Sequence, residues 1–205
     1  MSVKQVLVKV ANEYSRFISN VSYIVVKEFS DTILFMPCIV LITLSLLFTL
    51  SLALEGVPFA LLIVVFIMIT HDIINNITSI MNSLSSFTKT LLNIVFVSSY
   101  TVCLIGLTLY MLSKYTGAHT IVAILPLLTL SLTIVYDDVR SNIISRIKRL
   151  KPHITLIVIP KNVFFIVLII GLLFEVFTPF AIPTALIAYS IFLSLSILYI
   201  LFKSR

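Results

Sequence analysis

Few side chains in this 205-residue chain are placed to act together as acids, bases, nucleophiles or metal ligands. The three histidines, His71, His119 and His153, lie far apart in separate polar segments. Cys38 and Cys103 each lie inside an apolar run, which is typical of a thiol packed as a small hydrophobic side chain. No metalloprotease, Walker A or serine-hydrolase motif is present. We therefore expect no catalytic residue, no metal and no cofactor, and a chain that is not an enzyme.

Two stretches with acidic residues at helix ends could do chemistry: residues 71–79 (HDIINNITS), with one acid, and residues 136–142 (YDDVRSN), with two. In placement these stretches look like the two Asp-rich motifs of UbiA-type membrane prenyltransferases. That resemblance implies magnesium and a diphosphate, which need several converging carboxylates. Where the family has further Asp residues, this chain has Asn75, Ser79, and Ser141 or Asn142. A degenerate UbiA-like prenyltransferase is thus a lesser alternative. The remaining acids are better interpreted as helix-end residues at headgroup level: Asp72, Asp137 and Asp138.

Long apolar runs are the elements that must position these side chains. The chain is 60% hydrophobic and 11% charged, with a mean hydropathy of +1.20, far outside the range of soluble domains. About 20 apolar residues suffice for a helix to cross a bilayer. We therefore predict an all-α polytopic integral membrane protein with six transmembrane helices, leaving no room for a separate soluble domain. The runs are about 32–54, 57–76, 91–112, 119–136, 154–177 (alternatively Val163–Phe180) and 181–202.

Positive charge predicts the orientation of these spans. When alternate connections are assigned to opposite sides, all but one of the 14 Lys and Arg residues fall on the same side. Cytoplasmic loops retain Lys and Arg, so we expect a multi-pass cell-membrane protein with both termini, including the tail 203–205, in the cytoplasm. Lys114 alone lies outside. The others are Lys4, Lys9, Arg16, Lys27, Lys89, Arg140, Arg146, Lys148, Arg149, Lys151, Lys161, Lys203 and Arg205.

The segment 1–31 before the first run has the pattern of an amphipathic helix. Its apolar side chains recur at alternating spacings of four and three, with basic and amide side chains between them. This pattern predicts a helix in the cytoplasmic interface, serving as a membrane anchor, as a docking helix for a cytoplasmic partner, or as both. The apolar stripe comprises Val3, Leu7, Val10, Tyr14, Phe17, Val21 and Ile24.

Between the second and third runs, residues 73–90 are polar but keep apolar residues at helical spacing, which predicts a short cytoplasmic helix against the membrane. The order of elements resembles the permeases of type-2 ABC exporters, closest in length to the haem-exporter B branch. The similar stretches are the entry 25–32 (VVKEFSDT) and the connection 77–89 (ITSIMNSLSSFTK). The resemblance implies that this connection is a coupling helix for an ATPase subunit, with re-entry at Lys89. Its docking face would be Ile80, Met81, Leu84 and Phe87.

A dense basic segment follows the fourth run. It is typical of the positive-inside signal combined with anionic-lipid contact, and an acidic protein partner is the alternative. Its residues are Arg140, Arg146, Lys148, Arg149 and Lys151.

No charged residue lies near the middle of any predicted span, which weighs against a proton or sodium relay and against an ion pore. We therefore expect a membrane permease subunit for a lipidic or bulky apolar substrate, energised by a separate cytoplasmic ATPase. The main alternative is a non-catalytic membrane subunit or scaffold of a secretion, DNA-transfer or respiratory complex. Expected partners are membrane lipids, the ATPase or other membrane subunits, and further copies in a homo- or hetero-oligomer. We expect no nucleic-acid contact in the spans.

Overall fold

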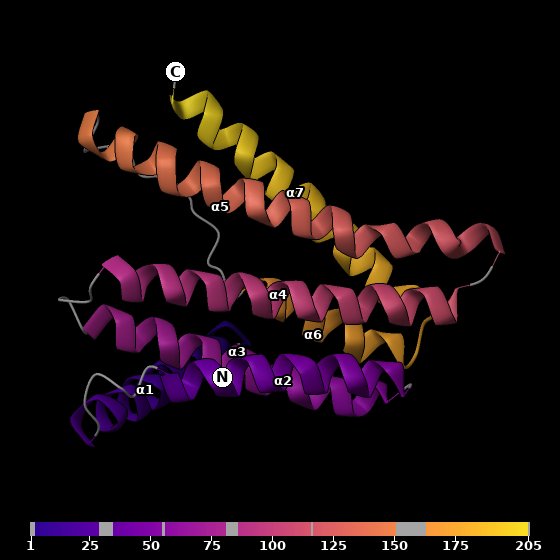
Figure 1. Cartoon of the computed structure of the whole chain (residues 1–205), viewed down its shortest axis with the longest axis horizontal. Coiled ribbons are helices and arrows are strands. Elements are labelled where there is room, and N and C mark those ends of the chain that lie inside the picture. Colours follow the sequence, from indigo (N-terminus) through magenta and orange to yellow (C-terminus); the bar gives the residue numbers. More distant parts are fainter. Residues whose placement is uncertain are drawn as a thin grey trace.

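The computed structural model describes residues 3–28, 35–54, 56–80, 86–115, 117–150 and 163–204. Helix is the only regular secondary structure among them (Figure 1). The elements are α1 (Val3–Glu28), α2 (Phe35–Ala53), α3 (Val57–Ile80), α4 (Ser86–Lys114), η2 (Gly117–Ile124), α5 (Leu125–Leu150), α6 (Val163–Glu175) and α7 (Ala181–Ser204). The prediction of an all-helical chain is confirmed for this part of the sequence.

Within the described part of the chain, five helical stretches are long and apolar enough to cross a membrane. Four of the helices involved carry a proline within their first three residues, where its missing N–H costs no helical hydrogen bond: Pro37, Pro58, Pro126 and Pro183. A multi-pass membrane protein is therefore the class that the helices support. The stretches are Phe35–Ala53, Val57–Ile80, Thr90–Lys114, Ile121–Val139 and Ala181–Phe202.

The fifth predicted run, 154–177, corresponds to α6, whose 13 residues begin at Val163. At 1.5 Å per residue, α6 is about 20 Å long, less than the ~30 Å apolar thickness of a bilayer. Residues 151–162 lie outside the described part of the chain. Six spans therefore remain a prediction, while five helices meet the length requirement.

The prediction of a separate short helix over residues 73–90 is wrong for those of its residues that the structure describes. Residues 73–80 continue α3, and residues 86–90 begin α4; 81–85 lie outside the description. No glycine or proline interrupts α3 after Pro58, so its helical hydrogen bonds continue past His71. Ile74 and Ile77, which were expected to face the membrane surface, are fully buried within the protein.

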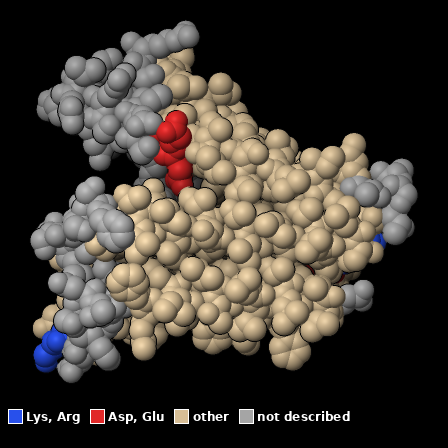
Figure 2. Space-filling view, viewed as in Figure 1, with Lys and Arg blue, Asp and Glu red and all other residues tan. Residues whose placement is uncertain are grey.

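Contacts between neighbouring helices form a closed ring, in the order α2, α3, α6, α7, α5, α4 and back to α2. The apolar stretch of α4 is 56% buried, against 22–28% for the other four, so α4 contributes most to the interior. The middle of the face shown in Figure 2 carries no charged side chain, as expected for a lipid-facing surface.

The two ends of the helical bundle differ. On the right of Figure 1 the connections are short: the α2–α3 turn, the α4–η2 junction and the α6–α7 turn. On the left, α5 continues from Arg140 to Leu150 beyond its apolar stretch, which adds about 16 Å of helix. The end of α3, the start of α4 and the helix α1 also lie on this side, so we call it the basic end.

Candidate functional site

A cluster of buried polar and aromatic side chains lies toward the basic end, centred on His71 of α3. His71 is only 1% exposed, although it lies where the second apolar run becomes polar and the sequence placed it in a polar segment. Its ring centroid lies 4.5 Å from that of Phe96 of α4 and 5.5 Å from that of Phe165 of α6. Aromatic rings of α4 and α6 therefore pack against one titratable side chain of α3.

Both ring nitrogens of His71 have polar neighbours. Nδ1 lies 3.0 Å from the amide nitrogen of Asn75, one turn along α3, and Nε2 lies 3.3 Å from the hydroxyl of Tyr100 on α4. Because the Asn75 amide nitrogen can only donate, Nδ1 is the acceptor, and a neutral imidazole then carries its proton on Nε2. The geometry suits a fixed polar cross-link between α3 and α4, and it also places a proton-binding group inside the bundle.

Asp72 connects this cluster to α1. The hydroxyl of Tyr14 on α1 donates a 2.7 Å hydrogen bond to Oδ2 of Asp72, and Oδ1 of Asp72 lies 3.7 Å from Nδ1 of His71. Burial, together with the Asp72 carboxylate, raises the pKa of Tyr14, so this hydroxyl remains a donor at physiological pH. We call Tyr14, His71, Asp72, Asn75 and Tyr100 the His71 cluster.

A second polar cluster closes the opposite end of the bundle. The Glu175 side chain, at the end of α6, is fully buried and accepts hydrogen bonds from the ammonium group of Lys114 and, at 2.9 Å, from the hydroxyl of Tyr115. Its other oxygen accepts the backbone N–H of Ile182 at 2.9 Å, near the start of α7. One carboxylate thus joins the end of α4 to the turn between α6 and α7.

Tyr115 completes this arrangement, which we call the Glu175 cluster. Its hydroxyl accepts the backbone N–H of Phe180 at 3.2 Å, and its ring stacks on that of Phe180 with centroids 4.7 Å apart. Phe180 has a positive φ of 74°, a conformation that side chains other than glycine rarely adopt. Burial and the hydrogen bond to Glu175 raise the pKa of Tyr115 to about 12, so it is a neutral donor at ordinary pH.

Hydroxyl groups join the helices between these clusters. Ser45 of α2 and Ser99 of α4 lie 2.6 Å apart, and Thr129 of α5 and Ser190 of α7 lie 3.0 Å apart, Oγ to Oγ. Ser45 also donates to the carbonyl of Leu41 in its own helix. Such bonds satisfy polar groups where water is absent, and they hold neighbouring helices together.

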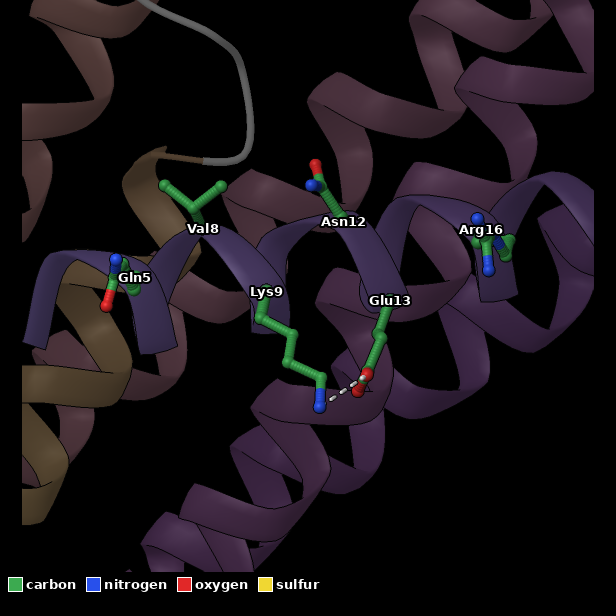
Figure 3. A pocket seen from close by; sticks show the side chains of 6 residues that line it. All are labelled: Gln5, Val8, Lys9, Asn12, Glu13 and Arg16. Atoms are coloured by element: carbon green, nitrogen blue, oxygen red, sulfur yellow. Dashed lines mark ion pairs between the residues drawn. The ribbon is translucent and has the colours of Figure 1, made fainter. Parts of the chain in front are cut away.

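The outer surface of α1 carries a hollow of about 510 Å³ (Figure 3). Among the residues that the structure describes, the side chains that line it come from this helix, and they include two cations, one carboxylate and two amides. Lys9 and Glu13 form a 4.0 Å ion pair on its rim, and each side chain is 67% exposed. The lining residues are Gln5, Val8, Lys9, Asn12, Glu13 and Arg16.

Most of the predicted docking and lipid-contact residues lie at positions where the structure describes no side chain. Ile80, at the end of α3, is 41% exposed. Phe87 lies on α4, and Arg140, Arg146, Lys148 and Arg149 lie on α5, but the structure does not describe the side chains of these five residues. Met81, Leu84 and Lys151 lie wholly outside the described residues. The predictions for these residues therefore stay predictions.

The acidic stretches do not assemble a metal site in the part of the chain that the structure describes. No three carboxylate, histidine or cysteine side chains there converge on one point. Asp72 instead accepts the Tyr14 hydrogen bond. This geometry gives no support to the diphosphate chemistry that a prenyltransferase requires.

Sequence reasoning missed the Glu175 cluster, although a signal was present. Lys114 is the exceptional cation of the charge pattern, and Glu175 ends a neighbouring apolar run on the same predicted side. Opposite charges at matching ends of two spans favour pairing. The burial of His71 had no comparable signal in the sequence. Comparison with family models, with curated proteins and with solved structures gives no match for this chain.

Proposed function

We propose that this chain is the membrane-embedded permease subunit of a transporter, with both termini in the cytoplasm and a separate cytoplasmic ATPase as its energy source. The observation that best supports the proposal is the asymmetry of the two ends (Figure 1). Helical extensions, α1 and the predicted basic residues all gather at one end, whereas the other end has only short connections. A cytoplasmic partner would therefore find nearly all of its docking surface at the basic end.

Continuous helices at the basic end suit transmission of force. α3 crosses the apolar layer and continues to Ile80 without a break, so a displacement at the α3–α4 connection would reach the His71 cluster within the same helix. Tyr14 and Asp72 tie α1 to the same part of α3. This arrangement would let an ATPase that pushes on the connection move the interior of the bundle.

The apolar spans support a lipidic or bulky apolar substrate. Side chains such as Phe59, Leu62 and Phe66 on α3 are at least half exposed along the bundle surface. The ion pair that the structure describes within the bundle lies at its end, with Glu175, and not in its middle. A charged substrate would cross such an interior only at a cost of several kcal/mol.

Co-purification tests this proposal directly. The tagged chain is recovered from its native membranes in mild detergent, and its partners are identified by mass spectrometry. We expect an ATPase subunit whose activity in proteoliposomes rises when the chain is present. Recovery of integral proteins alone, with no change in ATPase activity, would overturn the permease proposal and favour the alternative of a non-catalytic subunit or scaffold.

A matched pair of variants locates the docking surface. Ile80→Asp places a charge at the basic end, and Leu54→Asp, at a residue 75% exposed, places the same charge in the short turn at the other end. We expect Ile80→Asp, like Leu84→Asp and Phe87→Asp in the predicted docking face, to lower ATPase recovery at least tenfold. Leu54→Asp should leave it unchanged; equal losses from both positions would contradict docking at the basic end.

A further inference from the structure

We infer that α1 binds the headgroups of anionic phospholipids along one row of cations while a separate apolar row on the same helix enters the bilayer. The inference rests on the proposed position of α1 at the cytoplasmic membrane surface, but it does not require an ATPase partner. It is carried by the division of α1 into three faces, of which only one packs against the protein.

The first face fixes the direction of α1 relative to the bundle. Tyr14 contacts Asp72, and the Ser22 hydroxyl lies 3.5 Å from the carbonyl of Ile73, so two residues about 12 Å apart on α1 meet adjacent residues of α3. Ile18, between them, is 4% exposed. These contacts require α1 to cross α3 rather than run beside it. Because α3 is suited to span the membrane, this crossing places α1 close to the membrane plane. Figure 3 shows α1 running across other helices that lie behind it in that view.

The second face is apolar and uncovered. Val10, Phe17 and Ile24 are 57%, 51% and 57% exposed, and their spacing of seven residues places them in one row. Only part of the apolar stripe predicted from the sequence therefore packs on the protein. The row of Val10, Phe17 and Ile24 does not, and it needs an apolar environment outside the protein. At the end of a membrane-spanning helix, that environment is the boundary between the acyl chains and the headgroups.

The third face carries the positive charge. Lys9, Arg16 and Lys27 are all exposed, and spacings of 7 and 11 residues place them in one row along the helix. Lys9 and Arg16 each precede an apolar residue of the second face, so the two rows lie about 100° apart around the helix. A helix lying in the interface with this geometry has its apolar row in the bilayer and its cations at the level of the phosphates.

The hollow on α1 supports the choice of an anionic ligand. Lys9 and Arg16 line it together with the amide groups of Gln5 and Asn12, which can donate hydrogen bonds to phosphate oxygens (Figure 3). Glu13 also lines it, but its pairing with Lys9 is solvent-exposed and therefore weak. A volume of about 510 Å³ is of the size that small-molecule sites have.

A single introduced tryptophan tests the inference, because the chain has none. Phe17→Trp places an indole in the apolar row, and Ile24→Trp is a second reporter if the first variant is unstable. The purified full-length variant is reconstituted in brominated phosphatidylcholine vesicles, with and without phosphatidylglycerol, and quenching is measured. We expect quenching in both, with a clear increase and a blue shift when phosphatidylglycerol is present, and loss of the increase at high salt.

The charge row is tested with two triple variants. In Phe17→Trp, the changes Lys9→Gln, Arg16→Gln and Lys27→Gln should remove the phosphatidylglycerol-dependent increase, because each cation contributes about fivefold to such binding. As the matched control, Ser15→Gln, Ser19→Gln and Asn20→Gln change three exposed residues of α1 without changing its charge, and they should preserve the increase. Preservation in the first triple variant would overturn the inference. So would a water-like, unquenched indole in both lipids, which would show that this row lies in water rather than in the bilayer.

Discussion

The two ends of the bundle use different chemistry to hold neighbouring helices together. At the basic end, His71, Asn75 and Tyr100 form a set of hydrogen bonds surrounded by aromatic rings, and the Asp72 carboxylate at its margin bonds to Tyr14. At the opposite end, a fully buried carboxylate is paired with Lys114 and two further donors. A neutral hydrogen-bonding group can change from one partner to another at a low cost in free energy, whereas a buried charge without its partner is strongly unfavourable.

This difference between the ends fits the proposal that a cytoplasmic partner docks at the basic end. The end that would receive a cytoplasmic partner is held by contacts of modest strength, so α1 and the end of α3 can change position. The other end is fixed by an ion pair and by the stacked rings of Tyr115 and Phe180. We therefore expect α4 and the α6–α7 turn to move as one unit during transport.

The largest effect is expected at Glu175. Glu175→Gln removes the charge that Lys114 faces, although Lys114 is about one-third exposed and can partly recover hydration. We expect a loss of about 2–3 kcal/mol in the free energy of unfolding, measured by denaturant titration in mixed micelles. The double variant Glu175→Gln with Lys114→Met removes the unpaired charge and should recover part of that loss. A loss below about 0.5 kcal/mol in the single variant would remove the contrast between the two ends.

Gly106 lies between the two ends, and the loss of stability on its substitution is a reference for the losses expected at each end. A Cβ atom there would lie 2.7 Å from Oγ1 and 2.9 Å from Cα of Thr49, so α2 and α4 would have to separate. We expect Gly106→Ala to destabilise the fold by about 1–2 kcal/mol, less than the change at Glu175. Thr108→Ala is the control, because the Thr108 hydroxyl donates its hydrogen bond to the carbonyl of Leu104 in its own helix. Equal stability of wild type and Gly106→Ala would show that this contact is not tight.

A smaller effect is expected at His71. His71→Phe keeps a ring against Phe96 and Phe165 but leaves Asn75 and Tyr100 without their histidine partner. Because interhelical hydrogen bonds in membranes average about 0.6 kcal/mol, we expect a loss of about 1 kcal/mol. The measurement is the same unfolding titration. A loss as large as that of Glu175→Gln would mean that the two ends do not differ in the way proposed.

The smallest loss of stability is expected at Tyr14. Tyr14→Phe removes one hydrogen bond to Asp72 while its ring remains against α3, so the expected loss is about 0.5 kcal/mol. Its informative readout is local: amide exchange of α1 should become faster while that of α4 and α6 is unchanged. Tyr23→Phe is the control, since Tyr23 is 61% exposed. Faster exchange throughout the bundle would show that α1 is part of the core.

Local sequence was sufficient to predict the helices and to place most of the apolar stretches. Uninterrupted apolar residues in α2 and α7 must form helices in a membrane because the backbone has no other hydrogen-bonding partners there. Prolines mark the first turns of α2, α3, α5 and α7. The sequence failed at the end of α3, because the polar residues after His71 suggested a new element where the helix simply continues.

Pairings between distant residues were decided by the tertiary structure. Lys114 and Glu175 are 61 residues apart, and only the packing of the α6–α7 turn against the end of α4 brings them into contact. The three faces of α1 likewise depend on α3, since a helical repeat identifies an apolar stripe but not which part of it packs on protein. The sequence by itself thus determined which segments form helices and where along the chain the positive residues lie. Side-chain packing across helices decided which polar groups are paired, because that depends on which helices are neighbours in the bundle.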